Sequence, residues 1–192
     1  LLVREPDVDA FFGKLTQTMV EEGESPACAL WLLDEASGRC EPWMAYVKDR
    51  LLQLRTLNGP IAPPPGRMRF PCEAMARHLF EHTPGWTHTV EYRGDDQRLP
   101  ADVRAFNREM KWDVTFSTPL ALGSRTLGWM TFVSADDGDV KDQWWRVALL
   151  ETIALQAALA LHYSRLLELN RLEERRKATL DERNRLARDI HD

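Results

Sequence analysis

The sequence predicts an α+β fold: an antiparallel sheet flanked by helices, followed by a long C-terminal coiled-coil helix. Two observations lead to this prediction. Over the first 134 residues, segments with helical apolar spacing alternate with short apolar runs, in the order helix, strand, strand, loop, helix, strand, helix, strand, strand. From about residue 140, the helical pattern then continues to the last residue of the chain.

The N-terminal third is expected to form a helix and a strand hairpin. Residues 7–22 predict the helix, which ends at Gly23, because five apolar residues fall at helical spacing: Val8, Phe11, Phe12, Leu15 and Met19. Residues 27–33 form a continuous apolar run before a turn, which predicts a buried strand, and residues 40–47 fit its hairpin partner. Residues 58–66, rich in proline and glycine, are expected to form a loop.

The middle of the chain predicts two short helices and three strands. Residues 71–82 have a proline in their first turn and a helical apolar face made of Cys72, Met75, Ala76 and Leu79. Residues 87–92 read as a strand, and residues 100–110 as a second short helix. Two further strands, 114–122 and 126–134, are joined by a tight Gly-Ser hairpin turn.

The last fifty residues predict one long helix with a partner. Its first part carries an apolar stripe made of Leu149, Leu150, Ile153, Ala157, Ala160 and Leu161. Residues 171–188 mix basic and acidic side chains, and apolar residues return at Leu180, Ala187 and Ile190, which favours a coiled coil with charged flanks. Because such a helix is too long to pack on a domain of this size, we expect it to pair in a parallel homodimer.

Composition narrows the classes of function. Hydrophobic residues make up 44% of the 192 residues, so a substantial core is expected. The net charge of −5 and the lack of a basic face argue against nucleic-acid binding. No uninterrupted run of 18 apolar residues occurs, so this segment is not expected to contact a membrane. A cytoplasmic location is expected, although the parent protein could be attached to a membrane through sequence that precedes Leu1.

The three cysteines, Cys28, Cys40 and Cys72, are odd in number and are not spaced like zinc ligands. Reduced thiols are therefore expected, with Cys28 as a small buried residue in a strand. This usage agrees with the cytoplasmic location.

The segment Glu182 to Asp192, which reads Glu-Arg-Asn-Arg-Leu-Ala-Arg-Asp-Ile-His-Asp, places a histidine on a charged, apolar-striped helix and a carboxylate directly after it. The imidazole of His191 can act as a nucleophile, and Asp192 can take or orient its other proton. A charged helix end that happens to carry a histidine is the alternative. The segment resembles the H-box of sensor histidine kinases, in the class that pairs with nitrate-response-type regulators. This resemblance implies that His191 is the phosphoacceptor and Asp192 its acid-base partner; Arg188, one helical turn before His191, could support the phosphate.

Two further segments carry a second resemblance. Residues 117–132, Ser-Thr-Pro-Leu-Ala-Leu-Gly-Ser-Arg-Thr-Leu-Gly-Trp-Met-Thr-Phe, and residues 150–161, Leu-Glu-Thr-Ile-Ala-Leu-Gln-Ala-Ala-Leu-Ala-Leu, resemble the terminal hairpin and exit helix of a GAF domain. A PAS domain has a similar layered shape and stays an alternative. The resemblances imply a GAF-like sensory domain at 1–146, a signalling helix at 147–178 and, at 179–192, the start of a truncated dimerisation and phosphoacceptor domain.

Aromatic residues point to a ligand pocket. The chain has seven tryptophans, and Trp86, Tyr92, Phe106 and Trp112 lie in or beside the elements expected to wall the pocket. Any ligand is therefore expected between the sheet and the helices near 71–82 and 100–110. Simple core packing of these rings is the alternative.

The sensed ligand is not evident from the motifs. The Asn-Lys-x-Phe-Asp-Glu pattern of cyclic-nucleotide-binding GAF domains is absent, and no cysteine precedes a histidine as in bilin-binding members. Heme or metal binding through His78, His82 or His88 is an alternative, because the first two are four residues apart. No third ligand is apparent, and His78 is expected on the polar side of its helix, so no metal site is predicted.

The two resemblances together imply a function. The parent would be an ATP-dependent protein histidine kinase that uses ATP and Mg, phosphorylates His191 and passes the phosphate to a response regulator. The present chain lacks an ATP-binding domain and is expected to hold no cofactor and to be inactive alone. The alternative is a non-catalytic small-molecule-sensing or dimerisation module coupled to another output domain.

Overall fold

The computed structural model describes residues 8–34, 39–47, 49–53, 74–75, 77–79, 88–134 and 144–191. The chain divides into two compact units, residues 1–158 and residues 159–192. The first unit contains the sheet, and the second unit consists, in its described part, of helix. The predicted loop at 58–66 lies outside the described residues.

The first unit is built on a six-stranded sheet with the strand order β3-β2-β1-β6-β5-β4, in which every neighbouring pair is antiparallel. The strands are β1 Ala27–Asp34, β2 Arg39–Val47, β3 Arg50–Gln53, β4 Val90–Arg93, β5 Val114–Leu122 and β6 Arg125–Ser134. This sheet and its helices confirm the predicted α+β fold.

Both hairpins expected from the sequence are present. Strand β1 pairs with β2, and β5 pairs with β6 across a two-residue turn that opens on Gly123. Gly123 has a φ of 59°, the left-handed conformation that tight hairpin turns require and that glycine adopts without strain. Strand β3 was not predicted. It is a four-residue edge strand whose side chains are mostly exposed, so it has no apolar alternation to read.

The two central strands approach each other closely at Gly128 of β6. A Cβ atom added there would lie 2.0 Å from the carbonyl oxygen of Trp31 on β1. Strand pairing at this position therefore depends on the missing side chain.

Three helices have full bounds: α1 Val8–Glu22, α3 Ala101–Met110 and α4 Trp144–His191. Residues 74–75 and 77–79 are also helical and fall within the helix predicted at 71–82. Helix α1 packs on β1 and β2, where the rings of Phe12 and Trp43 lie 4.6 Å apart and Trp43 Nε1 donates to Asp9 at 3.0 Å. Phe11, expected on the apolar face, is 44% exposed.

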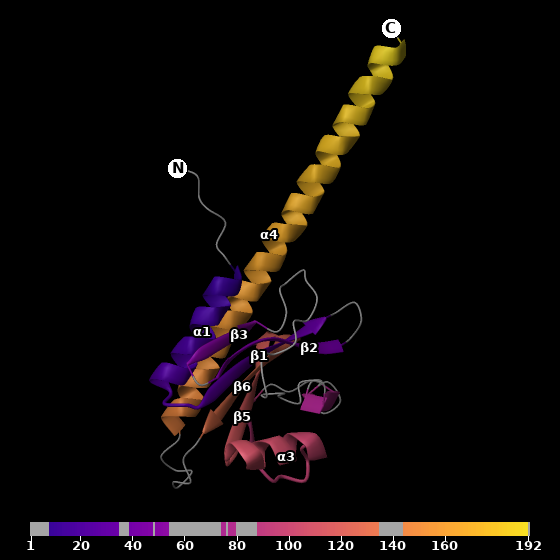
Figure 1. Cartoon of the computed structure of the whole chain (residues 1–192). Coiled ribbons are helices and arrows are strands. Elements are labelled where there is room, and N and C mark those ends of the chain that lie inside the picture. The colour runs from indigo at the N-terminus through magenta and orange to yellow at the C-terminus, as the bar shows by residue number, and fades with distance from the viewer. Residues whose placement is uncertain are drawn as a thin grey trace. The chain divides into compact units, whose positions relative to one another are not determined.

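The sheet is covered on both faces. Helix α1 and the first part of α4 lie on one side, and α3 with the helical residues 74–75 and 77–79 on the other (Figure 1). The hydroxyl of Thr89 lies 3.1 Å from Oγ1 of Thr118 on β5 and 2.6 Å from a carboxylate oxygen of Glu151 on α4. Thr118 therefore faces the layer that contains α4, and the strand period places its neighbour Ser117 on the opposite face of the sheet.

Helix α4 begins as part of the core of the first unit. Five of its residues there are almost fully buried, namely Leu150, Ile153, Ala154, Ala157 and Ala158. Much of the apolar stripe that the sequence analysis read as free to seek a partner is thus covered by the helix's own domain. This corrects that expectation for the part of the helix up to Ala158, about its first four turns.

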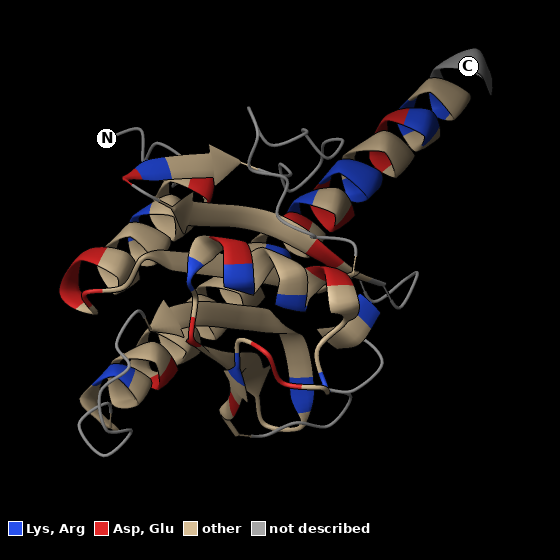
Figure 2. Ribbon diagram, turned by 60° about the horizontal axis from the view of Figure 1, so that its bottom comes forward, with Lys and Arg blue, Asp and Glu red and all other residues tan. Residues whose placement is uncertain are grey.

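The later part of α4 is highly charged. Lys, Arg, Asp and Glu alternate along it (Figure 2), and every residue from 168 to 188 is exposed. Even so, helix α4 contains an 18-residue window with a mean hydropathy of 1.3, of which 33% is buried, which is long and apolar enough to cross a membrane. A core helix of a water-soluble protein passes the same test, so composition alone does not assign α4 to a membrane.

Candidate functional site

A cavity lies in the first unit between the sheet and the layer that contains helix α3. Its floor comes from β1, β2, β3, β5 and β6, and its roof from Met75, Leu99, Trp112 and three residues of α3: Val103, Phe106 and Asn107. Its free space amounts to about 50 Å³ for the centre of a water-sized molecule. One water needs about 10–15 Å³ on this measure, so a ring-sized molecule fits.

Small floor residues leave this space. The floor includes Ala27, Ala29 and Ala45, which lie below the large side chains of Phe106 and Trp112. The rings of Phe106 and Trp112 meet edge to face, with their centres 5.2 Å apart. The cavity is thus an apolar space with small side chains on one side and two aromatic rings on the other, which suits an apolar ring.

The lining is almost entirely apolar. Among the described residues that line it, none is Asp, Glu, Lys, Arg or His. Its polar side chains are Thr115, Thr131, Asn107, the Cys28 thiol and the indole N–H of Trp31. That N–H donates to Oγ1 of Thr131 at 3.1 Å. The site therefore offers hydrogen bonds but no charge.

Two further buried polar groups lie on this face of the sheet. Ser117 is directly opposite Thr131 in the β5–β6 register, and Trp129 is two residues before Thr131 on β6. The Ser117 hydroxyl and the Trp129 indole nitrogen are buried and have no hydrogen-bond partner in the part of the chain that the structure describes. Buried polar atoms are rarely left unpaired in folded proteins, so water or a ligand is the expected partner.

No protein-family model matches the chain, and no curated protein matches its sequence. Solved structures do match: a domain assigned to a two-component sensor histidine kinase from Sinorhizobium meliloti 1021 is 14% identical, with 87% of this chain and 99% of that chain covered and a TM-score of 0.58. The chain has the fold of a GAF domain.

Two other matched structures are GAF domains from different kinds of protein. A GAF domain/HD domain protein from Geobacter sulfurreducens is 16% identical over 83% of this chain and 95% of that one, with a TM-score of 0.54. The GAF domain of a phosphoenolpyruvate-protein phosphotransferase from Coxiella burnetii is 12% identical over 86% and 89%, with a TM-score of 0.56. At these identities the likeness establishes the fold, and it favours GAF over the PAS alternative.

Of the four residues predicted to wall the pocket, two line the cavity. Phe106 and Trp112 line the cavity of the GAF domain. Tyr92 is buried in an adjoining apolar cluster with Trp31, Leu79 and Trp129. Trp86 lies outside the described residues. The alanine floor was missed by the sequence analysis, and its signal was the recurrence of alanine at alternate positions of β1.

The sequence predicts His78 on the polar side of its helix, but the structure places it in the interior. It is only 3% exposed, and its Nε2 lies 3.3 Å from the hydroxyl of Tyr92 on β4. The expectation was wrong because a partner from the sheet, the Tyr92 hydroxyl, allows the polar imidazole to be buried there. Burial raises the pKa of Tyr92 to about 12; nearby Arg98 lowers that pKa and Asp96 raises it.

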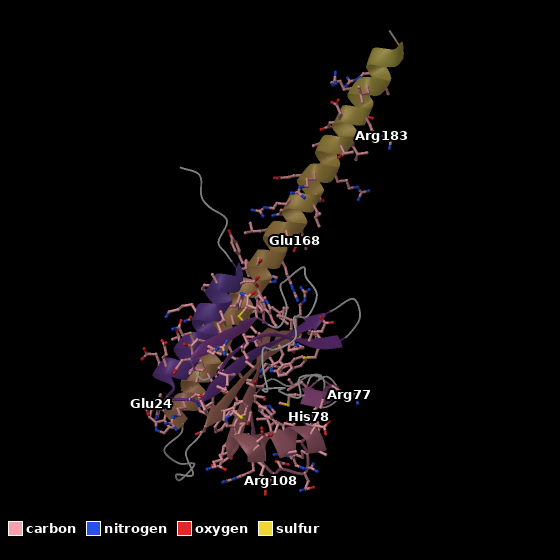
Figure 3. The ribbon with its side chains drawn as sticks, in the orientation of Figure 1. Glu24, Arg77, His78, Arg108, Glu168 and Arg183 are labelled. Atoms are coloured by element: carbon pink, nitrogen blue, oxygen red, sulfur yellow. The ribbon has the colours of Figure 1, made fainter. Side chains whose placement is uncertain are left out.

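A second, more open hollow lies beside His78. It is lined by Arg77, His78, Arg98 and the start of α3, including Asp102. Arg77 and His78 are labelled in Figure 3. The guanidinium of Arg98 sits over the Tyr92 ring at 4.8 Å and binds Asp96 at 2.6 Å. That hydrogen bond holds the pKa of Asp96 below its usual range.

The other histidines considered as heme or metal ligands do not come together in the described part of the structure. His88 is exposed, and His82 lies outside the described residues. Within the described ranges, no group of three His, Cys, Asp or Glu side chains is arranged to hold a metal ion. His78 is committed to the contact with Tyr92.

The two described cysteines are buried and unpaired. Burial raises the pKa of the Cys40 thiol to about 12 and raises that of Cys28 as well. Both thiols are therefore protonated at neutral pH and are poor nucleophiles, as expected for structural cysteines. Cys72 lies outside the described residues.

The phosphoacceptor segment belongs to the second unit. His191 is the last residue of helix α4, and Asp192 lies outside the described residues. Arg188 donates from Nε to the carbonyl oxygen of Asn184 at 3.2 Å. Arg185 binds Glu182 at 2.8 Å, and this hydrogen bond lowers the pKa of Glu182. Glu168 and Arg183, labelled in Figure 3, mark the same exposed stretch of α4.

Proposed function

We propose that the chain is the sensory and dimerisation part of a two-component sensor histidine kinase, in which a signal in the GAF domain controls phosphorylation of His191. One observation carries the proposal: helix α4 is unbroken from Trp144 to His191. The element that is buried at its start in the GAF domain is therefore the element that bears the phosphoacceptor motif. The likeness to a domain assigned to a sensor histidine kinase supports the same assignment.

The proposed chemistry belongs to the parent protein. The imidazole of His191 attacks the terminal phosphorus of ATP, which the parent binds with Mg in a separate catalytic domain, and ADP leaves. Asp192 takes or orients the second imidazole proton. Arg188, one helical turn from His191, supports the transferred phosphate once it exchanges its bond to the Asn184 carbonyl for the phosphate. An aspartate of a response regulator then accepts the phosphoryl group.

The start of α4 is attached to the sheet by polar as well as apolar contacts, which supports its role in transmission. Arg146 is 8% exposed; its guanidinium lies 3.5 Å from the Ser134 hydroxyl at the end of β6 and 3.5 Å from a carboxylate oxygen of Glu24 after α1. The contact of Thr89 with Glu151 adds a second link. A shift of the β5–β6 hairpin is thereby passed directly to the helix.

The proposed dimer uses a second stripe on α4. Leu155, in the first unit, is 53% exposed. In the second unit, Leu159, Leu166, Leu169 and Leu180 are between 44% and 60% exposed. Their spacings of four, seven, three and eleven residues are those of the a and d positions of a coiled coil. A parallel homodimer would bury this stripe, which is separate from the stripe that faces the sheet.

A non-catalytic module is the second candidate. GAF domains with the same fold occur in an HD domain protein and a phosphotransferase, so the fold alone is compatible with other outputs. In that case α4 would only connect and dimerise. The kinase proposal is favoured by the eleven-residue motif at 182–192.

Phosphate labelling of the parent kinase tests the proposal. His191→Gln should abolish incorporation of label from ATP, because His191 alone among the five histidines has a carboxylate immediately after it. His162→Gln, on the same helix, is the matched control and should label normally. Samples are kept at neutral or basic pH because phosphohistidine is acid-labile. Normal labelling of the His191→Gln protein would refute the kinase assignment.

A further inference from the structure

We infer that the cavity of the GAF domain takes a small, uncharged, largely hydrocarbon molecule that carries a hydrogen-bond acceptor, anchored at Ser117 and Trp129. The inference deepens the proposed sensory function and rests on it. It comes from the absence of charge among the described lining residues, from the size of the cavity, and from two buried donors on the same face of the sheet that have no partner in the described chain and are not themselves among the lining residues.

The uncharged lining of the cavity disfavours a charged ligand. Among the described lining residues there is no charged side chain, and the polar ones are neutral hydroxyl, amide, thiol and indole groups. An ion buried without an opposite charge loses much of its hydration free energy, which neutral donors only partly replace. A carboxylate or ammonium ligand is therefore disfavoured relative to a neutral molecule of the same shape.

The two buried donors favour a ligand that carries a hydrogen-bond acceptor. The Trp129 indole nitrogen can only donate, and it has no partner in the described chain. The Ser117 hydroxyl is 0% exposed and equally unpartnered. It stands opposite Thr131, whose hydroxyl already accepts the Trp31 N–H and lines the cavity. Facing residues of antiparallel strands have Cβ atoms about 4.5–5.5 Å apart, so a ligand atom at Thr131 is within reach of Ser117.

The size of the cavity limits the ligand to about one ring. The free space of about 50 Å³ for water-sized centres holds several times what one water requires. Alanines line one side of this space, and the rings of Phe106 and Trp112 line the other. A ketone, aldehyde, ester or ether on a single ring fits these properties, and a tetrapyrrole is too large for the described cavity.

Three probe molecules with equal numbers of non-hydrogen atoms separate these properties. Acetophenone has a neutral acceptor, isopropylbenzene has none, and benzoate is charged. Each is titrated into the 192-residue chain, and its dissociation constant is read from tryptophan indole N–H resonances. Trp129→Phe identifies the Trp129 signal. We expect acetophenone to bind about three- to tenfold more tightly than isopropylbenzene, as one neutral hydrogen bond allows, to shift the Trp129 resonance, and to bind more tightly than benzoate.

Matched variants test the anchor. Ser117→Ala should weaken acetophenone by about three- to tenfold and leave isopropylbenzene unchanged. Ser124→Ala, in the exposed turn of the same hairpin, should change neither. Ala45→Leu fills the floor and should abolish binding of both probes. Because Ser117→Ala removes a hydroxyl that is unpaired without ligand, the free variant should unfold at a temperature no lower than that of the parent chain.

The outcomes distinguish the inference from the proposed function. If isopropylbenzene matches acetophenone, or if Ser117→Ala binds acetophenone normally, the acceptor is refuted while the cavity remains a binding site. If benzoate binds most tightly, the uncharged class is refuted. If no probe binds, or if the Ala45→Leu variant binds the probes as tightly as the unmutated 192-residue chain does, the cavity itself is refuted as a ligand site. Failure of the kinase assignment is read separately, from the labelling of His191.

Discussion

Two leucines of α4 provide a matched test of how the helix is attached to the GAF domain. Leu150 is 0% exposed and Leu155 is 53% exposed, and both belong to the first compact unit. Leu150→Ala removes a fully buried side chain and leaves a cavity, which costs about 2–5 kcal/mol of unfolding free energy. In a chain of this size each kcal/mol lowers the melting temperature by about 2–4 °C, so a fall of roughly 4–20 °C is expected.

The same substitution at Leu155 should behave differently. In the monomer its side chain is half in solvent, and alanine favours helix at least as well as leucine, so a change within about 0.5 kcal/mol is expected. In the proposed homodimer Leu155 lies in the seam. Leu155→Ala should therefore weaken dimerisation by about tenfold or more, because a lost core contact costs on the order of 1.4 kcal/mol or above.

Two measurements separate these effects. Urea unfolding followed by tryptophan fluorescence, at concentrations where the chain is monomeric, gives the two changes in stability. Light scattering and sedimentation at high micromolar concentration give the dimer. Equal losses of monomer stability for the two variants would refute the burial of α4 against the sheet. A chain that stays monomeric at high micromolar concentration would refute the helix-paired dimer.

Three other predictions follow from particular contacts. In the parent kinase, Asp192→Asn should slow labelling by about a hundredfold or more without changing the labelled residue, because it removes an acid-base group. Gly128→Ala should cost at least about 1–3 kcal/mol in urea unfolding, because its Cβ would meet the Trp31 carbonyl, whereas Gly123→Asn in the open turn should cost about 0.5 kcal/mol or less. Stability should fall as the pH rises from about 9 to about 12, because the unfolded chain loses the Cys40 proton near the ordinary value of 9.0 and the folded chain holds it to about 12. Cys40→Ala should make this part of the pH curve less steep without removing the slope, because burial also raises the pKa values of Cys28 and Tyr92; an unchanged slope would contradict the burial of Cys40.

Sequence patterns predicted the elements whose stability is local or repeated along the chain. The β5–β6 hairpin has apolar runs on both sides of a glycine turn, so it was predicted nearly to the residue. Strand β3 has no such pattern. Its Arg-Leu-Leu-Gln sequence becomes a strand through backbone pairing with β2, and that partner is not visible in four residues.

Side-chain environments were harder to predict because they depend on the opposing layer. His78 is buried because β4 presents the Tyr92 hydroxyl to it, and Phe11 is exposed although it shares the apolar spacing of Phe12. In helix α4 the sequence showed one apolar stripe clearly, and the structure assigns much of that stripe to the domain core. The leucines at 155 and 159, on the other side, were not distinguished from it.

The cavity was also hard to predict from the sequence, although one sequence pattern does indicate it. Large rings at Phe106 and Trp112 drew attention to the roof, but rings also fill cores, so they do not by themselves predict a space. The more informative signal is the pair of alanines at alternate positions of β1, Ala27 and Ala29, because small residues on one face of a central strand leave room above it. On β6, Thr131 lines the cavity, whereas Phe132 lies beside Gly23 at the end of α1, and the strand period places Met130 on the same face as Phe132. Strand β6 therefore contributes one face to the cavity and, through Ser134 at its end, a contact with Arg146 at the start of α4, so it is a direct physical connection between a ligand in the cavity and the helix that ends at His191.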